Sequence, residues 1–313
     1  MTVAAIVIGR NEGARLIACL EALSGVEPVI YVDSGSTDGS VKAAQTRGAQ
    51  VVALDMSQPF TAARARNAGL EKLPPDCQFV QFLDGDCVVQ AGWLEQARAF
   101  LAARPDVAVV CGRRREIAPQ ASVYNGLIDA EWDTPVGAAL ACGGDALMRV
   151  GALRAIDGYR DDLIAGEEPE MCLRLRKQGW IIWRLDAEMT AHDAQITRFS
   201  QWWKRSKRAG HAFAEGAALH GAPPERHWVA ETRRALIWGA AVPLVIIVFA
   251  LLFGPWALWG VLVYPLQVAR LARGGGWRWA LFSVLGKFAE TQGALSYYWR
   301  QIRGGKKRLI EYK

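Results

Sequence analysis

The sequence predicts an α/β fold with a mainly parallel, twisted sheet flanked by helices, followed by a C-terminal helical hairpin that crosses a membrane. Two observations lead to this prediction. From residue 3 to residue 111, short apolar runs alternate with helix-like segments, which is the pattern of βαβ units. The longest uncharged stretches come late instead, at 235–253 and 256–269. We therefore expect a sheet-based part and a membrane-embedded part in one chain.

Charge is divided between the same two parts. Residues 198–313 hold 18 Lys or Arg and 5 Asp or Glu, a net charge of +13, whereas residues 1–197 hold 19 and 26, a net charge of −7. An acidic domain with a basic membrane-facing tail divides in this way, and a uniformly basic nucleic-acid binder does not. Six scattered cysteines without a Cys-x-x-Cys pair argue against zinc and against a disulfide framework, and fit a reducing cytosol.

Six apolar runs are predicted strands: 3–8, 29–32, 51–54, 79–83, 107–111 and 180–185. Residues 139–150 predict a further strand, a glycine turn and the start of a helix. The first run lacks a positive n-region and is too short for a signal peptide, so it is taken as a core strand. Apolar residues at helical spacing follow several of these runs, as in 60–73 and 166–178. Residues 113–140 show weak periodicity, and we expect irregular structure there that covers the site.

The fourth run ends in Asp84-Gly85-Asp86. In open α/β sheets, ligands bind beyond the carboxyl ends of the strands. Two carboxylates separated by one glycine can present oxygens to a hard cation such as Mg²⁺ or Mn²⁺. The alternative is a strand followed by an ordinary Asp-Gly turn.

Further charged side chains belong to loops that should gather at the same edge of the sheet: Glu12, Asp33, Arg64 and Arg66. This set suits a nucleotide diphosphate with a metal ion, because a strand-end Asp accepts from a base or ribose and Arg pairs with phosphate. Neither a Gly-x-x-x-x-Gly-Lys-Ser/Thr loop nor a Gly-x-Gly-x-x-Gly fingerprint is present. The P-loop and dinucleotide-binding hypotheses therefore lose their main support.

Five motifs occur in a fixed order: Gly-Arg-Asn-Glu at 9–12, Val-Asp-Ser-Gly-Ser-Thr-Asp-Gly-Ser at 32–40, Ala-Arg-Asn-Ala-Gly-Leu at 65–70, Leu-Asp-Gly-Asp at 83–86 and Gly-Glu-Glu-Pro-Glu at 166–170. In this order and spacing, residues 3 to about 193 resemble the family 2 glycosyltransferases. The resemblance implies the GT-A fold, a nucleotide-sugar donor (a UDP- or GDP-sugar), a divalent metal (Mg²⁺ or Mn²⁺) and inversion at the anomeric carbon.

The same resemblance assigns the donor contacts to residues at the matching positions: Glu12, Asp33, Asp38, Arg66, Asp84, Gly144 and Asp145. Asp33 would contact the base, Asp84 the ribose, and Arg66 the base or phosphate. Gly143, Gly144 and Asp145 would lie beneath the sugar. The metal would be held by Asp86, with His192 as a late metal or diphosphate ligand.

The predicted catalytic base lies in Gly166-Glu167-Glu168. Members of the family commonly carry Gly-Glu-Asp here, and the Asp takes the proton from the acceptor hydroxyl. Glu168 occupies that position with one extra methylene, which still lets it reach a proton about 2.6–3.2 Å away after a small backbone adjustment. Glu167 remains the alternative base. Both acids also suit the first turn of a helix, as a purely electrostatic cap.

The C-terminal third of the sequence predicts where in the cell the protein lies. A stretch of about 20 apolar residues spans a bilayer, and 235–253 meets that length, with Gly254-Pro255 as the break before a shorter return span. Arginines flank the pair on both outer sides, which places both ends, and the acidic domain, on the cytoplasmic side of the cell (inner) membrane. A basic, Trp-containing segment at 199–214 suits the headgroup layer. Residues 277–300 form either an interfacial helix or a third span.

Four divisions are predicted: a catalytic domain at 1–197, an amphipathic interfacial linker at 198–234, a transmembrane hairpin at 235–272, and an interfacial helix with a basic tail at 273–313. The expected partners are a nucleotide-sugar donor, a membrane, and a lipid or lipid-linked saccharide as acceptor. A growing polysaccharide is the alternative acceptor.

Three other functions are alternatives to glycosyl transfer. A haloacid-dehalogenase-type phosphatase usually has Thr two residues after the second Asp, where this chain has Val88. A sugar-phosphate nucleotidyltransferase carries a basic, Gly-rich N-terminal loop, whereas residues 8–12 are acidic and poor in glycine. A non-catalytic membrane protein that binds nucleotide sugars would differ only in its lack of transfer and hydrolysis.

Overall fold

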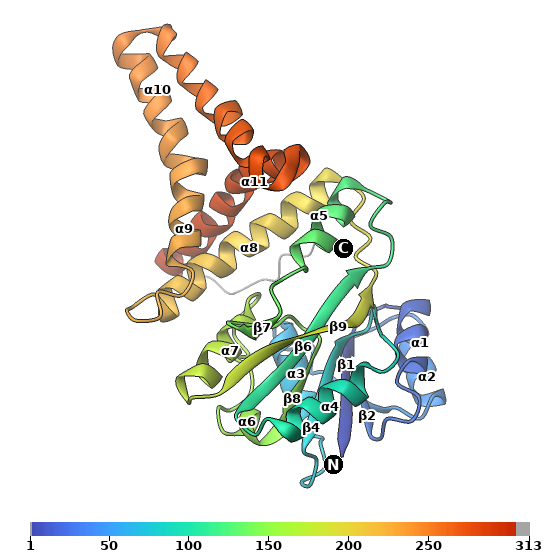
Figure 1. The fold of residues 1–313 in the computed structure, drawn as a ribbon. Helices are drawn as coiled ribbons and strands as arrows, with labels where there is room; N and C mark the ends of the chain where they lie inside the picture. The colour runs from blue at the N-terminus through green and yellow to red at the C-terminus, as the bar shows by residue number, and fades with distance from the viewer. Residues whose placement is uncertain (1, 305–313) are drawn as a thin grey trace. The chain divides into compact units, whose positions relative to one another are not determined.

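The structure, a computed structural model, describes residues 2–304. The chain divides into two units, Met1–Gln195 and Ile196–Lys313. The first unit holds a sheet flanked by helices, and the second is helical (Figure 1).

Within the described residues of the first unit, nine strands form one sheet, in the order β3-β2-β1-β4-β8-β6-β9-β5, with β7 paired to β9. Four neighbouring strands are mutually parallel: β3 (Gln50–Ala53), β2 (Val29–Asp33), β1 (Val3–Gly9) and β4 (Phe79–Asp84). Their carboxyl ends therefore lie at one edge of the sheet, which brings Asp33 and Asp84 to that edge.

The remaining strands make the sheet mixed: β8 (Ala146–Arg149), β6 (Val107–Glu116), β9 (Ile181–His192), β5 (Cys87–Val89) and β7 (Gly137–Ala139). β8 runs antiparallel to both β4 and β6, and β9 runs parallel to β6 but antiparallel to β5 and β7. The predicted parallel arrangement is thus confirmed for the first four strands and does not extend to the whole sheet. The reason is that the chain enters β8 from the carboxyl edge, next to Asp84, and must run back.

Seven helices are described in this unit: α1 (Ala14–Glu21), α2 (Ser40–Thr46), α3 (Ala62–Leu70), α4 (Trp93–Ala103), α5 (Val123–Glu131), α6 (Val150–Arg154) and α7 (Glu167–Lys177). They flank the sheet on both faces (Figure 1). The start of α3 is fixed by Thr61, whose hydroxyl accepts a hydrogen bond from the backbone N–H of Arg64 at 3.1 Å. This cap sets the helical phase that turns Arg66 into the interior.

Residues 113–140 are more regular than the sequence predicts. β6 continues to Glu116, and α5 and β7 follow it. The Ser122 hydroxyl caps α5 by accepting from the N–H of Asn125 at 3.0 Å. The weak apolar periodicity has a cause, because the buried residues of α5 are Asn125 and Ile128, and one of them is polar.

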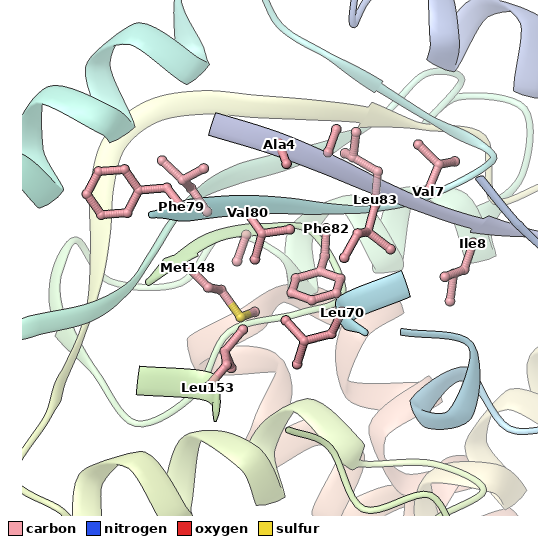
Figure 2. Packing of buried hydrophobic residues seen from close by; sticks show 14 of the residues in the cluster. Ala4, Val7, Ile8, Leu70, Phe79, Val80, Phe82, Leu83, Met148 and Leu153 are labelled. Atoms are coloured by element: carbon pink, nitrogen blue, oxygen red, sulfur yellow. The ribbon is translucent and has the colours of Figure 1, made fainter. Parts of the chain in front are cut away.

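The core of the first unit lies on both faces of the central strands. Figure 2 shows Phe82 of β4 directed toward Leu70 of α3, Met148 of β8 and Leu153 of α6. All four side chains are buried, and burial of each removes apolar surface from water at about 25 cal/mol per Å². The packing fixes β4 in place up to its last residue, Asp84.

The second unit contains the remaining elements: α8 (Phe199–His220), α9 (Val229–Leu236), a π-helical turn (Ile237–Ala241), α10 (Val242–Phe253), a 3₁₀ segment (Pro255–Leu262) and α11 (Val263–Arg303). Residues 229–253 form one helix that is long and apolar enough to cross a membrane, and its most apolar stretch is not buried by the protein. Among the described residues, no other helix meets these length and composition criteria.

α8 and α11 pack closely through glycines. A Cβ atom at Gly210 would collide with the backbone of Glu290, and one at Gly293 would collide with the backbone of Lys207. The Trp203 indole also donates to the Gln292 side chain at 3.0 Å. The two helices therefore meet backbone to backbone, as small residues permit.

The predicted return span and the segment after it both fall within the 3₁₀ segment and α11. Gly276 has non-helical angles (φ 78°, ψ 162°) and divides α11 into two pieces. Residues 277–300, for which the sequence predicts an interfacial helix or a third span, form the helical piece after this break. The second span of the hairpin stays a prediction. The basic tail at 305–313 lies outside the described residues.

Candidate functional site

Asp33 is at the carboxyl end of β2 and is held by its own loop. Its Oδ2 accepts from the N–H groups of Gly35 and Ser36 at 3.0 and 2.9 Å, and its Oδ1 accepts from the Tyr31 hydroxyl at 3.0 Å. The carboxylate is buried. These bonds fix Asp33 at the edge where the sequence places the base of the donor.

Glu12 and Asp38 occupy the neighbouring loops. Glu12 pairs with Arg15 at 2.7 Å, and its side chain packs against the backbone of Gly85, so it supports the turn between Asp84 and Asp86. Asp38 is exposed and accepts from the N–H of Ser40 at 2.9 Å. Hydrogen bonds from Ser40 hold the pKa of Asp38 below its ordinary value.

The centre of the site is Arg66, which is 2% exposed. Its Nη1 lies 2.9 Å from Glu167 and 3.0 Å from Glu168, and its Nη2 lies 3.0 Å from Asp84. These acids come from the end of β4 and the start of α7, more than eighty residues apart in sequence. One buried guanidinium thus joins the predicted base to the predicted donor-binding aspartate.

The surroundings shift the proton affinity of Glu168. Burial raises the pKa of Glu168 to about 7, the charge of Glu167 adds to the rise, and the Arg66 guanidinium opposes it. A carboxyl group whose pKa lies near neutral pH is suited to accept a proton from a substrate. Perturbed carboxyls of this kind in a charged cluster are candidates for catalysis.

Gly144 lets the backbone approach this cluster. A Cβ atom there would lie 2.5 Å from Nη2 of Arg66 and 3.2 Å from both Asp84 and Glu168. The next residue, Asp145, is fully buried and accepts from Arg114 at 2.5 and 2.8 Å and from the Thr190 hydroxyl at 2.5 Å. Gly144 therefore lets the backbone lie directly beside these acids, and its predicted place beneath the sugar stays a prediction.

Arg114 was not anticipated from the sequence. Its Nη2 also lies 3.8 Å from Oδ2 of Asp84, and its guanidinium lies over the ring of Trp132 at 5.2 Å. Arg114 and Arg66 thus place positive charge on two sides of Asp84. The available signal is the run of three arginines at 113–115, directly after the fifth predicted strand, in a stretch whose weak periodicity predicts irregular structure.

Asp86, in the turn directly before β5, lies close to His192 at the end of β9. Cys87 of β5 pairs with His192 of β9, and Nε2 of His192 lies 3.4 Å from Oδ1 of Asp86. Both side chains are buried. Neighbouring ligands of an octahedral cation with bonds of 2.0–2.1 Å lie about 3 Å apart, so this carboxylate and imidazole fit one divalent ion.

A second group of possible ligands, Asp84, Cys87 and Asp145, fits a cation poorly. Asp145 already accepts from a guanidinium and a hydroxyl. Burial raises the pKa of the Cys87 thiol well above its usual range, which disfavours the thiolate that binds metals. Cys87 belongs to both groups, because its sulfur also lies within 4.8 Å of ligand atoms of Asp86 and His192. The cation position at Asp86 and His192 therefore adjoins the cluster around Arg66.

The structure thus brings together most of the predicted site and separates a few members. Arg66, Asp84, Glu167 and Glu168 make direct contact. Arg64 instead donates to the carbonyls of Asp55, Gln58 and Pro59. The roles assigned to individual residues are tested by the experiments below.

The arrangement has a defined chemical capacity. Glu168, with a pKa near 7, lies beside Arg66 at the carboxyl edge of the parallel strands. Asp84 joins Arg66 to Arg114, and the candidate cation position at Asp86 and His192 adjoins this cluster. Arginines and a cation stabilise negative charge that develops on a leaving group. The carboxylate can remove a proton from an attacking hydroxyl.

Comparison with known proteins agrees with this geometry. Residues 4–153 match the family described as Glycosyl transferase family 2. Pre-mycofactocin glycosyltransferases of two Mycobacterium tuberculosis strains are 28% identical over 230 residues, which cover 67% of this chain and 46% of theirs. The chain thus spans about half the length of the curated relatives it matches.

Two solved structures share the fold. A mannosyltransferase from Pyrobaculum calidifontis, in complex with GDP-Man and Mn²⁺, has a TM-score of 0.68 at 20% identity, over 96% of this chain and 87% of that one. Glucosyl-3-phosphoglycerate synthase from Mycobacterium tuberculosis, with Mn²⁺, UDP and glucosyl-3-phosphoglycerate, has a TM-score of 0.50 at 16% identity, over 71% and 81%. Residues 4–153 thus match the family 2 glycosyltransferase model, and the fold is the GT-A fold.

Proposed function

We propose that this protein transfers a sugar from a UDP- or GDP-sugar to the hydroxyl of a lipid or lipid-linked saccharide, with inversion at the anomeric carbon. The observation that carries the proposal is the contact of Arg66 with Glu168 and Asp84. It joins a carboxyl of pKa about 7 to the strand end at which α/β sheets bind nucleotides.

The donor would lie along the carboxyl edge of the parallel strands. Asp33 would accept from the base and Asp84 from the ribose, while Gly144 permits close approach of the sugar. The solved relatives bind GDP-Man or UDP together with Mn²⁺, which supports a nucleoside diphosphate and a divalent cation here. We therefore place the diphosphate between Arg66 and the cation position.

A divalent cation held by Asp86 and His192 would neutralise charge on the diphosphate oxygens. An imidazole ligand favours a transition metal, whereas Mg²⁺ prefers oxygen ligands alone. We therefore propose Mn²⁺ ahead of Mg²⁺. Arg66 and Arg114 contribute further positive charge near Asp84.

Glu168 would act as the general base. Its carboxylate takes the proton of the acceptor hydroxyl while the acceptor oxygen forms a bond to the anomeric carbon. The bond from that carbon to the phosphate oxygen breaks on the opposite face, and its electron pair leaves with the nucleoside diphosphate. One substitution of this kind inverts the anomeric centre.

The proposal of a lipid acceptor rests on the second unit of the chain. The helix 229–253 is weak support for membrane association. Arginines lie just before it, at 233 and 234, and on α11 beyond the 3₁₀ segment, at 270 and 273. Positive residues favour the cytoplasmic side, which would place the catalytic unit at the cytoplasmic face of the inner membrane, within reach of a lipid acceptor.

The test is a panel of UDP- and GDP-sugars with the full-length protein in detergent. Release of nucleoside diphosphate is measured with Mn²⁺, with Mg²⁺ and with EDTA, in the presence and absence of bacterial lipid extract. We expect release with one donor that depends on metal and rises when lipid is added. Donor binding by calorimetry without release or transfer under any condition would instead support a non-catalytic nucleotide-sugar-binding protein.

A further inference from the structure

Glu116 is a buried acid next to the candidate cation position. It ends β6, and the strand register pairs it with His192 of β9. His192 pairs on its other side with Cys87 of β5. Residues paired directly across strands point to the same face of a sheet, so the Glu116 and His192 side chains share a face.

The two ring nitrogens of His192 face two different acids. Nε2 lies 3.4 Å from Oδ1 of Asp86, and Nδ1 lies 3.8 Å from Oε2 of Glu116. Among the described residues, Nδ1 has no hydrogen-bond partner, because 3.8 Å is longer than a hydrogen bond. The edge of the Trp132 ring packs against the imidazole, with ring centroids 5.1 Å apart.

Glu116 is held rigidly by donors on both oxygens. Oε1 accepts from the N–H of Ala118 at 3.1 Å and from Nδ2 of Asn125 at 3.2 Å. Oε2 accepts from the N–H of Ala194 at 3.0 Å. The same Oε2 atom lies 3.8 Å from Nδ1 of His192, so a small movement of the imidazole would bring the two within hydrogen-bond distance.

We propose that Glu116 is a positioning residue that keeps the His192 proton on Nδ1 and leaves the lone pair of Nε2 for the cation beside Asp86. A neutral imidazole carries one proton, and the hydrogen bond made by one nitrogen decides which nitrogen can bind a metal. Carboxylates that accept from a metal-binding histidine orient the ring and fix this tautomer. The cation part of this inference rests on the proposed function, and the tautomer part does not.

The substitution Glu116→Gln tests whether Glu116 sets the tautomer, because the amide has one acceptor end and one donor end. The end at Oε1 meets two donors and the end at Oε2 meets one donor, so the amide oxygen favours the Oε1 position. The NH₂ group then faces His192, and Nδ1 must accept instead of donate. The proton moves to Nε2, which removes the lone pair that faces the cation position.

The tautomer is read by long-range ¹H–¹⁵N NMR of ¹⁵N-histidine-labelled full-length protein in detergent, at pH 8 with EDTA. The chain has four histidines, and His192→Gln assigns the signal. We expect the Nδ1–H form in the wild type and the Nε2–H form in Glu116→Gln. Asn125→Ala is the matched control, because it removes a donor from Oε1 and from the Ala118 carbonyl but leaves Oε2 unchanged, and it should keep the wild-type form.

Metal affinity gives the second readout. Mn²⁺ binding followed by electron paramagnetic resonance should weaken about 10- to 100-fold in Glu116→Gln and by less than about threefold in Asn125→Ala. An Nε2–H form in the wild type overturns the inference even if Glu116→Gln fails to fold. Unchanged tautomer or unchanged Mn²⁺ affinity in a folded Glu116→Gln also overturns it. A wild type with the Nδ1–H form but no Mn²⁺ binding supports the positioning role and overturns the cation of the proposed function.

Discussion

The Arg66 guanidinium lies 3.0 Å from the Glu168 carboxylate, and both side chains are largely removed from solvent. The same Nη1 atom lies 2.9 Å from Glu167. Burial and the second glutamate disfavour the ionised form of Glu168, whereas the arginine favours it, and the balance leaves a pKa of about 7. The proposed base is therefore close to half ionised at neutral pH.

Glu168→Gln should lower kcat about 10²- to 10⁴-fold, since general-base catalysis is worth roughly that much. Donor affinity should stay within about threefold, because the amide can still accept from Arg66. Steady-state kinetics and calorimetric titration of the donor check the two expectations. Glu167→Gln is the matched control. If it loses the turnover instead and Glu168→Gln keeps it, the base is Glu167.

The pH dependence of kcat should follow the ionisation of Glu168. Only the carboxylate can take a proton, so kcat rises as pH increases through about 7 and then levels off. Because the charge of Arg66 lowers this pKa, Arg66→Gln should move the rising limb to higher pH. Initial rates from pH 5.5 to 9 at saturating donor measure it. A limb that stays in place in Arg66→Gln would show that another group titrates.

Gly144→Ala should disrupt the site where Gly143→Ala does not. The new Cβ at Gly144 would lie 2.5 Å from Nη2 of Arg66, which three acids hold in place, whereas the nearest atom to a Cβ at Gly143 is 3.9 Å away, on Arg114. We expect kcat/KM to fall at least about 10-fold for Gly144→Ala and less than about twofold for Gly143→Ala. Equal effects of the two alanines on kcat/KM would contradict the close approach.

The first four strands and most of the site could be predicted because they depend on local signals. An apolar run followed by an aspartate defines both a strand and its carboxyl end, and parallel strands bring Asp33 and Asp84 to one edge. The motifs also predict that Arg66 and Glu168 belong to one site. Their contact could not be predicted, because the pairing depends on the rotation of α3 and the entry of α7.

The end of β6 shows why the rest could not be predicted. Four consecutive charged residues, 113–116, resemble a loop, yet each finds partners from distant elements. Arg114 reaches Asp145, and Glu116 reaches Ala194 and Asn125. Such burial of charge is stable only when the partners are in place. The apolar periodicity of the sequence therefore does not predict that these residues are buried.

Removal of either proposed ligand should abolish tight metal binding. Asp86→Asn and His192→Ala should each weaken Mn²⁺ binding at least about 10-fold, and EDTA should suppress transfer by the wild type. Cys87→Ser is the control, because the thiol is within reach of both ligands but its raised pKa keeps it protonated. Calorimetry with MnCl₂ compares the four proteins. Loss of affinity in Cys87→Ser would make the sulfur a ligand.

Charges placed in the helix 229–253 should prevent its insertion. Ile247 and Leu251 are 52% and 80% exposed, so Lys at both positions leaves the folded unit intact while it adds about 2.5–3.5 kcal/mol per charge to insertion at the bilayer centre. Carbonate washing of membranes from a bacterial host should retain the wild type in the pellet and release Ile247→Lys/Leu251→Lys. Leu219→Lys, on α8 outside this helix and also exposed, should stay in the pellet. Because unassisted surface binding does not survive carbonate, a wild type found in the supernatant would mean that the helix lies on the membrane or away from it.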